Sequence, residues 1–320
     1  MRHAVAALVI AFAAALLLYP GYTALLTRHG VGQRVQAYNP ATHRVKAGTP
    51  TMGGLLFCAV TVAVWLILDR TRSGFVLVFA LTAGAMLGLL DDRANIKGRG
   101  VFGISAYEKL AAQAVIGLLI GVALAVAGAT RQYFPGLGAP DLHAAGIIVV
   151  SILGTDAVSN AVNLTDGVDG LAGSVSAVVF AGLLAVAIHQ RALPAVIISA
   201  ALLGALVAFL VFNWFPARVF MGDSGSLALG CALVATSAEV HLLWLLPLMG
   251  IVFVAETLTV IVNVTAIRRF HRRIFRASPL HHHFEEVGLR EQRLVVMFAA
   301  VAAAGTILTV LYARSRGVAA

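Results

Sequence analysis

Long apolar segments separated by short polar ones run along the whole chain. They fall at about residues 4–26, 52–68, 75–90, 110–128, 144–160, 170–188, 193–213, 225–241, 243–266 and 294–313. Segments of about 16–22 residues suit transmembrane helices, whereas barrel strands would alternate over about ten residues. The pattern therefore predicts an all-α polytopic membrane protein of about ten transmembrane helices, forming a single integral membrane domain over residues 1–320.

Composition supports this prediction. Hydrophobic residues make up 60% of the 320 residues and charged residues 12%, and the mean hydropathy is +0.92, whereas soluble domains are about a quarter charged. Cys58 and Cys231 lie inside apolar segments, so we expect neither a disulfide framework nor a CxxC metal site. The apolar run that begins at Ala4 is interpreted as the first membrane helix rather than a signal peptide.

Lys and Arg are distributed unevenly between the two sets of loops. The loops after the first, third, fifth, seventh and ninth segments carry 16 of these residues, and the opposite loops carry 4. The positive-inside rule then predicts that the first set is cytoplasmic and that both termini lie on the outer, periplasmic side. Topology thus explains the net charge of +9, and we expect no nucleic-acid partner. The candidate chemistry described next falls on the predicted cytoplasmic face.

Residues 160–173 read N-A-V-N-L-T-D-G-V-D-G-L-A-G and interrupt the apolar pattern. Asp166 and Asp169 have no Lys or Arg within this run, and carboxylates at a membrane boundary are functional by default when they face a cavity. The glycines permit tight turns and close approach of a ligand. The alternative is an ordinary polar loop between two helices.

Asp91 and Asp92 follow an apolar segment directly. Adjacent carboxylates repel and stay ionised at low cost only beside a metal or a basic partner. Arg93, Lys97 and Arg99 follow closely in the sequence. The alternative is an acidic pair solvated at a helix end.

A second acidic motif, G-D-S-G at residues 222–225, begins a new apolar segment. Such a turn could present the Asp223 carboxylate and backbone N–H groups to an anion or hold a divalent cation, and a simple helix N-cap is the alternative. Lys46 precedes a Thr/Pro/Gly turn in H-R-V-K-A-G-T-P-T-M-G-G, where it could also be a snorkelling lysine.

Three consecutive histidines, His281, His282 and His283, stand in P-L-H-H-H-F-E-E. This spacing does not suit a zinc site on a helix, so phosphate contact and proton transfer are the expected uses. Nearby arginines could attract anionic lipid head groups. With the carboxylates, these groups favour Mg²⁺ over zinc and predict a membrane enzyme acting on phosphate or diphosphate at the cytosolic boundary.

The motifs resemble a known family over nearly the whole chain. The matching runs are K-A-G-T-P-T-M-G-G at 46–54, G-L-L-D-D at 88–92, S-A-Y-E-K-L-A-A-Q at 105–113, N-A-V-N-L-T-D-G-V-D-G-L-A at 160–172, F-N-W-F-P-A-R-V-F-M-G-D-S-G-S-L-A-L-G at 212–230, E-T-L-T-V-I at 256–261 and R-I-F-R-A-S-P-L-H-H-H-F-E at 273–285. The chain resembles the polyprenyl-phosphate N-acetylhexosamine-1-phosphate transferases. The P-L-H-H-H-F-E run points to their muramoyl-pentapeptide branch.

This resemblance implies a reaction and a set of site residues. The reaction joins UDP-N-acetylmuramoyl-pentapeptide to undecaprenyl phosphate, giving lipid I and UMP in the bacterial inner membrane, with Mg²⁺ as cofactor and a homodimer as the assembly. The implied catalytic residues are Asp91, Asp92, Asp223 and His281, with one of the Asp91–Asp92 pair deprotonating the lipid phosphate and Asp223 also binding the metal. The implied substrate-binding residues are Lys46, Asn163, Asp166, Gly167, Asp169, Asn213, Phe220, Ser226 and His282, with Asp169 and Phe220 at the uracil.

One departure and two alternatives accompany the resemblance. Asn95 stands where the branch usually has Lys, and Arg93 or Lys97 could substitute for that charge. A transferase that uses UDP-N-acetylglucosamine for another glycan is the alternative within the family. A secondary transporter is the alternative from another class, and it would need ionisable groups at mid-membrane depth. Glu256 lies well inside a segment, and we expect it to make a helix–helix hydrogen bond.

Overall fold

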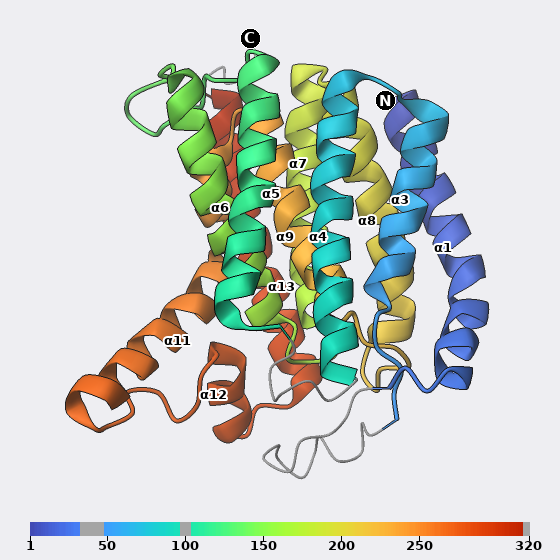
Figure 1. Ribbon diagram of the computed structural model, residues 1–320, viewed down its shortest axis with the longest axis vertical. Helices are drawn as coiled ribbons and strands as arrows, with labels where there is room; N and C mark the ends of the chain where they lie inside the picture. Colours follow the sequence, from blue (N-terminus) through green and yellow to red (C-terminus); the bar gives the residue numbers. More distant parts are fainter. Residues whose placement is uncertain (33–47, 97–103, 316–320) are drawn as a thin grey trace.

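The computed structural model describes residues 1–32, 48–96 and 104–315, which form a bundle of helices (Figure 1). In these residues, β-structure is limited to three isolated bridges between loop residues. The prediction of an all-α protein is therefore confirmed.

The helices follow one another through mostly short connections. In chain order they are α1 Arg2–Arg28, α3 Gly54–Leu68, α4 Arg72–Ile96, α5 Ala106–Val126, α6 His143–Thr165, α7 Leu171–Gln190, α8 Leu193–Asn213, α9 Asp223–Glu239, the 3₁₀ turn η1 Leu243–Leu245, α10 Leu246–Met249, α11 Ile251–Phe270, α12 Leu280–Glu286 and α13 Glu291–Ser315.

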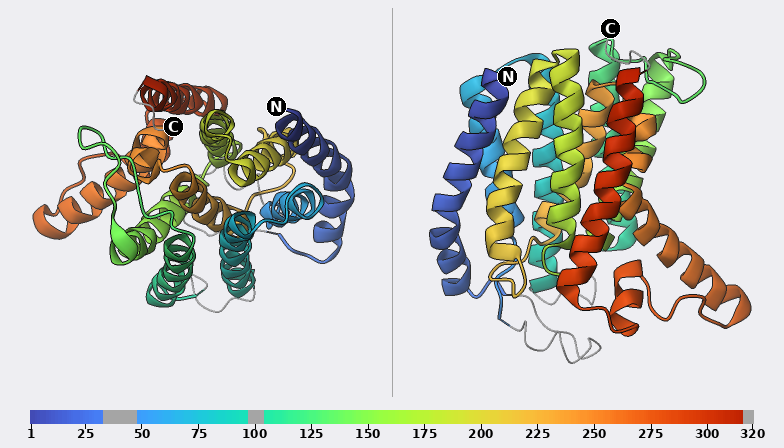
Figure 2. Two further views of the ribbon diagram at one scale, coloured as in Figure 1. Left: turned by 90° about the horizontal axis from the view of Figure 1, so that it is seen from above. Right: turned by 180° about the vertical axis from the view of Figure 1, so that it is seen from behind.

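Eight of the described helices are long and apolar enough to cross a membrane. Nine of the ten predicted segments each coincide with one helix, and the segment at 243–266 covers η1, α10 and most of α11. The two predicted segments outside these eight long helices are α3, with 15 residues, and α9, with 17. The start of α1 and the end of α13 lie at the same end of the bundle (Figure 2). The polytopic membrane class is thus confirmed, while the number of ten spans and the outward position of the termini stay predictions.

One predicted segment is divided. Residues 243–266 form η1, α10 and the first part of α11, and the break falls at Gly250. Pro247 lacks the backbone N–H that a helix interior requires, and glycine has a low helix propensity. Helix α11 therefore starts afresh at Ile251 and continues four residues beyond the predicted end.

Helix α9 lies in the middle of the bundle. Every residue from Ser224 to Ala238 is buried, and α4, α6 and α3 pack around it. Gly88 permits the close approach of α4, because a Cβ at this position would clash with the backbone of Asp223 and Ser224. Since α9 is shielded from lipid by its neighbours, it tolerates small and polar residues. The packing brings the C-terminal end of α4 against the N-terminal end of α9.

Helix α11 leaves the bundle at an angle, and the chain after it turns back into α12, which packs against α11 (Figures 1 and 2). This end of the molecule is opposite to the start of α1 and the end of α13. The ends of α4 and α6 and the start of α9 lie there too, so the predicted site residues gather at one end of the bundle.

Candidate active site

Asp92, near the C-terminal end of α4, caps the N-terminus of α9. Its two carboxylate oxygens accept hydrogen bonds from the backbone N–H groups of Asp223 and Ser224, both at 3.0 Å. Gly222, with a φ of 76°, turns the chain into the helix, and a Cβ there would lie 2.8 Å from the Asp92 carboxylate. The first N–H groups of a helix lack partners within it and favour a negative charge. The D-D and M-G-D motifs therefore meet through this cap.

Asp91 has a different set of partners. One carboxylate oxygen accepts a hydrogen bond from Lys109 Nζ at 2.8 Å, and the other accepts one from the Ile104 N–H at 3.1 Å. A capping box at Ser105 starts α5 and puts Lys109 in its first turn. The repulsion expected between adjacent carboxylates is relieved because Asp91 faces an ammonium, whereas Asp92 faces a helix N-terminus.

Asn163, close to the end of α6, connects Lys109 to Asp223, the candidate metal ligand. Its Nδ2 donates to Asp223 Oδ1 at 2.5 Å and to Ser226 Oγ at 2.9 Å. Its Oδ1 accepts from Lys109 Nζ at 3.4 Å. Asn95, the departure from the family pattern, also lies here, with Nδ2 3.4 Å from Asp223 Oδ2. Asn163, Asp223 and Ser226 thus belong to one hydrogen-bonded network.

Asp166, directly after α6, is half-buried and accepts a hydrogen bond from the Gly222 N–H. Burial raises the pKa of the Asp166 carboxyl well above its usual value, and neighbouring carboxyl groups add to the shift. These neighbours are Asp223, Asp92 and Asp169. The cluster therefore holds more acidic groups than a single ammonium offsets, and this favours the binding of a further cation.

Asp169 and Asn213 fasten the connection between α8 and α9 to the turn after α6. Asp169 Oδ2 accepts a hydrogen bond from the Ala217 N–H at 2.9 Å. Asn213 Oδ1 accepts from the Gly170 N–H at 3.0 Å, and its Nδ2 donates to the Val219 carbonyl at 2.9 Å. Both side chains are buried. They shape one wall of the site, and their direct contact with a nucleotide stays a prediction.

Phe220 is half-buried where this connection passes the start of α3. Its N–H donates to the Pro50 carbonyl, and its carbonyl accepts from the Gly53 N–H, both at 2.8 Å. The turn before α3 is thereby held next to the M-G-D motif. Lys46, from the same sequence motif as this turn, lies outside the described residues.

His281, in α12, is buried against the turn at Gly167. Its side chain is 1% exposed, and a Cβ at Gly167 would overlap the imidazole ring. Glu256 Oε2, on α11, lies 3.2 Å from His281 Nδ1. His282 is partly buried, with its ring centroid 4.2 Å from that of His281 and its Nδ1 2.6 Å from Glu285 Oε2.

The structure thus brings most predicted site residues together at one end of the bundle. The acidic cluster and its immediate surroundings contain Asp91, Asp92, Asn163, Asp166, Gly167, Asp223, Ser226 and His281. The adjoining segments carry Asp169, Asn213, Phe220 and His282. Their grouping is an observation, and the individual roles given to them remain predictions.

Two side chains in this region were not assigned a site role from the sequence. From the sequence, Lys109 is one of the basic residues of a predicted cytoplasmic loop. Its position directly after the S-A-Y-E capping box is the signal that places it in the first turn of a helix. Glu256 was expected to make a helix–helix hydrogen bond, and it does, from α11 to α12. Glu256 is a lone acid in an apolar segment, and this is the sequence signal for a functional role.

The side chains around Asp223 can be compared with the ligands that the implied Mg²⁺ would need. Within the described ranges, no three His, Cys, Asp or Glu side chains already surround a common metal position. The carboxyl groups of Asp91 and Asp223 nevertheless lie next to each other, and a cation would relieve this contact between two acids. Carboxylate oxygens are the ligands that Mg²⁺ prefers. The residues present therefore fit a hard divalent cation, with Asp223 as its first ligand.

An acidic cluster with a paired lysine, set at one end of an apolar helix bundle, is the arrangement of a membrane-embedded transferase. The family described as "Glycosyl transferase family 4" matches residues 74–241, and the "Phospho-N-acetylmuramoyl-pentapeptide-transferase signature 1" matches residues 46–58. These two matches include both acids of the D-D motif, Asp223 and the turn before α3.

Curated relatives give the narrower family. The chain is 38% identical to the phospho-N-acetylmuramoyl-pentapeptide-transferase of Anoxybacillus flavithermus, over 91% of this chain and 92% of the relative. It is 38% identical to that of Heliobacterium modesticaldum, over 98% of both chains, and 39% identical to that of Bacillus pumilus, over 95% of both. The chain belongs to the phospho-N-acetylmuramoyl-pentapeptide-transferase family.

Proposed function

We propose that this chain transfers the phospho-N-acetylmuramoyl-pentapeptide unit from its UDP conjugate to undecaprenyl phosphate, giving lipid I and UMP for peptidoglycan synthesis. The observation that carries the proposal is the network of Asp91, Lys109, Asn163 and Asp223 at one end of an apolar bundle, in a member of this family. We extend the proposal to a homodimer in the bacterial inner membrane, with the site facing the cytoplasm.

The reaction needs positioning and charge neutralisation more than covalent help. An oxygen of the lipid phosphate attacks the phosphorus that bears the sugar. A new P–O bond forms, the bond to UMP breaks, and UMP leaves with the electron pair. The Lys109 ammonium, held between Asp91 and Asn163, is suited to neutralise charge on the phosphates.

Direct attack by the lipid phosphate is the route that we favour. An aspartyl-phosphate route would need a free carboxylate oxygen as nucleophile. Both oxygens of Asp92 accept hydrogen bonds from the start of α9, and both oxygens of Asp91 accept hydrogen bonds from Lys109 and Ile104. These bonds lower the nucleophilicity of the two carboxylates and leave them suited to hold Asp223 and Lys109 in place.

Mg²⁺ belongs to the proposal as a cofactor held by Asp223. When bound, it would supply positive charge to the diphosphate. The support from the chain itself is the contact between the acidic groups of Asp91 and Asp223 and the raised pKa of Asp166. We propose that Asn163, Asp166, Gly167, Asp169, Asn213, Phe220, Ser226 and His282, together with Lys46, contact the nucleotide sugar.

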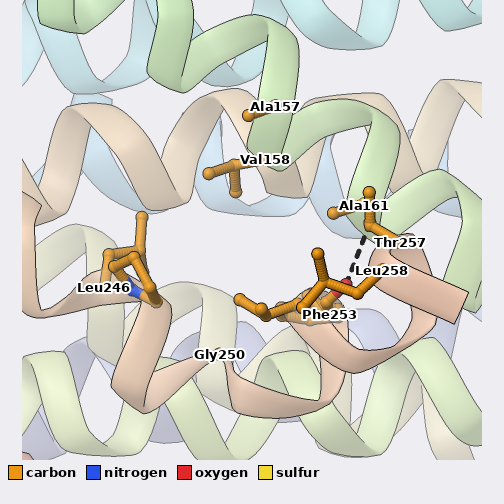
Figure 3. Close-up of a pocket in the computed structure, with 10 residues that line it drawn as sticks. Ala157, Val158, Ala161, Leu246, Gly250, Phe253, Thr257 and Leu258 are labelled. Atoms are coloured by element: carbon orange, nitrogen blue, oxygen red, sulfur yellow. Dashed lines mark hydrogen bonds between the residues drawn. The ribbon is translucent and has the colours of Figure 1, made fainter. Parts of the chain in front are cut away.

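An apolar pocket of about 180 Å³ supports a proposal for the lipid acceptor. It lies between α6 and the α10–α11 corner, and Figure 3 shows Ala157, Val158 and Ala161 facing Leu246 and Phe253 across it. Helix α6 continues from this pocket to Asn163. We propose that the pocket takes part of the polyprenyl chain, because its lining is apolar and one of its lining residues, Ala161, is two residues from Asn163 on α6.

A UMP-release assay on the purified protein tests the proposed function. Undecaprenyl phosphate is supplied with UDP-N-acetylmuramoyl-pentapeptide or with UDP-N-acetylglucosamine, each with and without Mg²⁺. We expect release only with the pentapeptide nucleotide and only with Mg²⁺. Release with UDP-N-acetylglucosamine alone would support the alternative within the family. Substrate passage across liposomes without UMP release would support a transporter.

A further inference from the structure

Helix α11 presents a buried polar face to the segment that follows it. Glu256 and Asn263 are seven residues apart, which puts them on the same side of a helix, and both are buried. Asn263 Oδ1 accepts hydrogen bonds from the Ile274 and Phe275 N–H groups at 3.1 and 2.9 Å, and its Nδ2 donates to the Phe275 carbonyl at 3.1 Å. This residue fastens the returning chain to α11 before it enters α12.

Glu256 makes the second attachment, to His281 itself. Its Oε2 accepts a hydrogen bond from the His281 backbone N–H at 3.3 Å and lies 3.2 Å from Nδ1 of the ring. The two side chains are 0% and 1% exposed. A carboxylate in an apolar interior is costly unless it is paired. The arrangement therefore indicates a purpose beyond joining two helices.

The contact with Glu256 decides which ring nitrogen of His281 faces the acidic cluster. With Nδ1 turned towards Glu256, Nε2 is on the opposite side of the ring, against Gly167. Neither ring nitrogen has a partner in hydrogen-bond geometry among the described residues, and Nδ1 is the one that lies beside the Glu256 carboxylate. Gly167 follows the half-buried Asp166 of the acidic cluster, so this nitrogen faces the region where the substrate phosphates are proposed to bind.

We propose that Glu256 is a positioning residue that acts through His281, an inference that rests on the proposed function. It holds the ring with Nδ1–H directed at its carboxylate and Nε2–H directed at a substrate phosphate oxygen. Carboxylates that orient a functional histidine in this way fix which ring nitrogen faces the substrate.

Kinetics of the Glu256→Gln variant test this role. Gln keeps an oxygen that can accept the backbone N–H of His281 but carries no charge. We expect kcat to fall roughly 10- to 100-fold, with KM for the nucleotide sugar nearly unchanged and with partial rescue in Glu256→Asp. Thr259→Val, which removes a buried hydroxyl three residues further along α11, is the matched control and should stay within about twofold of the wild type.

A double-mutant cycle separates positioning from general stabilisation. If Glu256 acts through His281, adding Glu256→Gln to His281→Ala should lower the residual kcat by less than about twofold. Full multiplication of the two single losses, or a Glu256→Gln enzyme with wild-type kcat, would overturn the inference.

A spectroscopic readout is independent of turnover. Nitrogen-15 NMR of histidine-labelled protein, with the His281 signals identified by their loss in His281→Ala, should show a protonated Nδ1 that changes in Glu256→Gln. An Nδ1 without a proton in the wild type would refute the pairing. Absence of UMP release by the wild type would instead refute the proposed function and leave this measurement to decide the pairing by itself.

Discussion

Replacing Asp92 with Ala tests whether this carboxylate holds the start of α9 in addition to any role in the reaction. The change removes the acceptor of two backbone N–H groups, those of Asp223 and Ser224, which donate to Asp92 at 3.0 Å. A buried N–H left without an acceptor costs about 1–3 kcal/mol, so the pair costs about 2–6 kcal/mol. Since the rest of α9 is buried in the bundle, we expect its first turn to open locally while the fold persists.

Hydrogen–deuterium exchange with mass spectrometry measures this opening. A loss of about 2 kcal/mol, the low end of the range, corresponds to roughly 30-fold faster exchange. We expect the amides of residues 223–226 to gain at least this rate in Asp92→Ala, and the amides of α13 to stay unchanged. Asp92→Asn keeps one oxygen acceptor and should give an intermediate rate.

Lys109→Met is the matched control for this exchange experiment. It removes a charge from the same site, but the lysine makes its described hydrogen bonds to Asp91 and Asn163 rather than to the start of α9. We expect it to leave exchange at residues 223–226 close to that of the wild type. Wild-type exchange in Asp92→Ala would refute the cap and leave Asp92 with a purely chemical role.

Three further predictions concern charges in the same network. Lys109→Met should lower kcat by about 100-fold or more, the usual loss for one electrostatic contact in a transition state, and Lys109→Arg should recover part of it; near-normal turnover in Lys109→Met would rule out charge neutralisation by this residue. Asp223→Asn should abolish Mg²⁺-dependent UMP release with an unchanged far-ultraviolet circular dichroism spectrum, and normal turnover would contradict its metal role. Asn95→Lys should be neutral or mildly activating in the same assay, because the hydrogen bond from Asn95 to Asp223 is long, at 3.4 Å. An inactive enzyme would mean that the local geometry has diverged from that of the relatives.

The break between α10 and α11 at Gly250 is a feature that the hydropathy pattern does not predict. Hydropathy predicts one continuous apolar segment over residues 243–266, but it takes no account of the backbone N–H that Pro247 lacks or of the low helix propensity of Gly250. The corner matters for function, because α10 and the start of α11 form one side of the apolar pocket. Pro247 and Gly250 within the apolar segment are the sequence signals for this corner.

The sequence by itself determined the class of protein, the helices and the residue types of the site. These follow from local properties: the length of apolar runs, the asymmetry of basic loops and short motifs such as D-D, M-G-D and H-H-H. The same motifs were sufficient to predict that the chemistry would gather at one face, and the grouping of Asp92 with Asp223 and of Gly167 with His281 agrees with that prediction.

The partner of each side chain in the site could be determined only from the tertiary structure. Asp91 and Asp92 are neighbours in sequence, yet one pairs with Lys109 and the other with the N-terminus of α9. The acid of α11, Glu256, accepts a hydrogen bond from the His281 backbone N–H and lies 3.2 Å from its ring. Such pairings depend on how closely helices distant in sequence approach, as Gly88 allows for α4 and α9. Side-chain contacts change over a few ångströms, and hydropathy and motif spacing do not specify distances between helices at that scale.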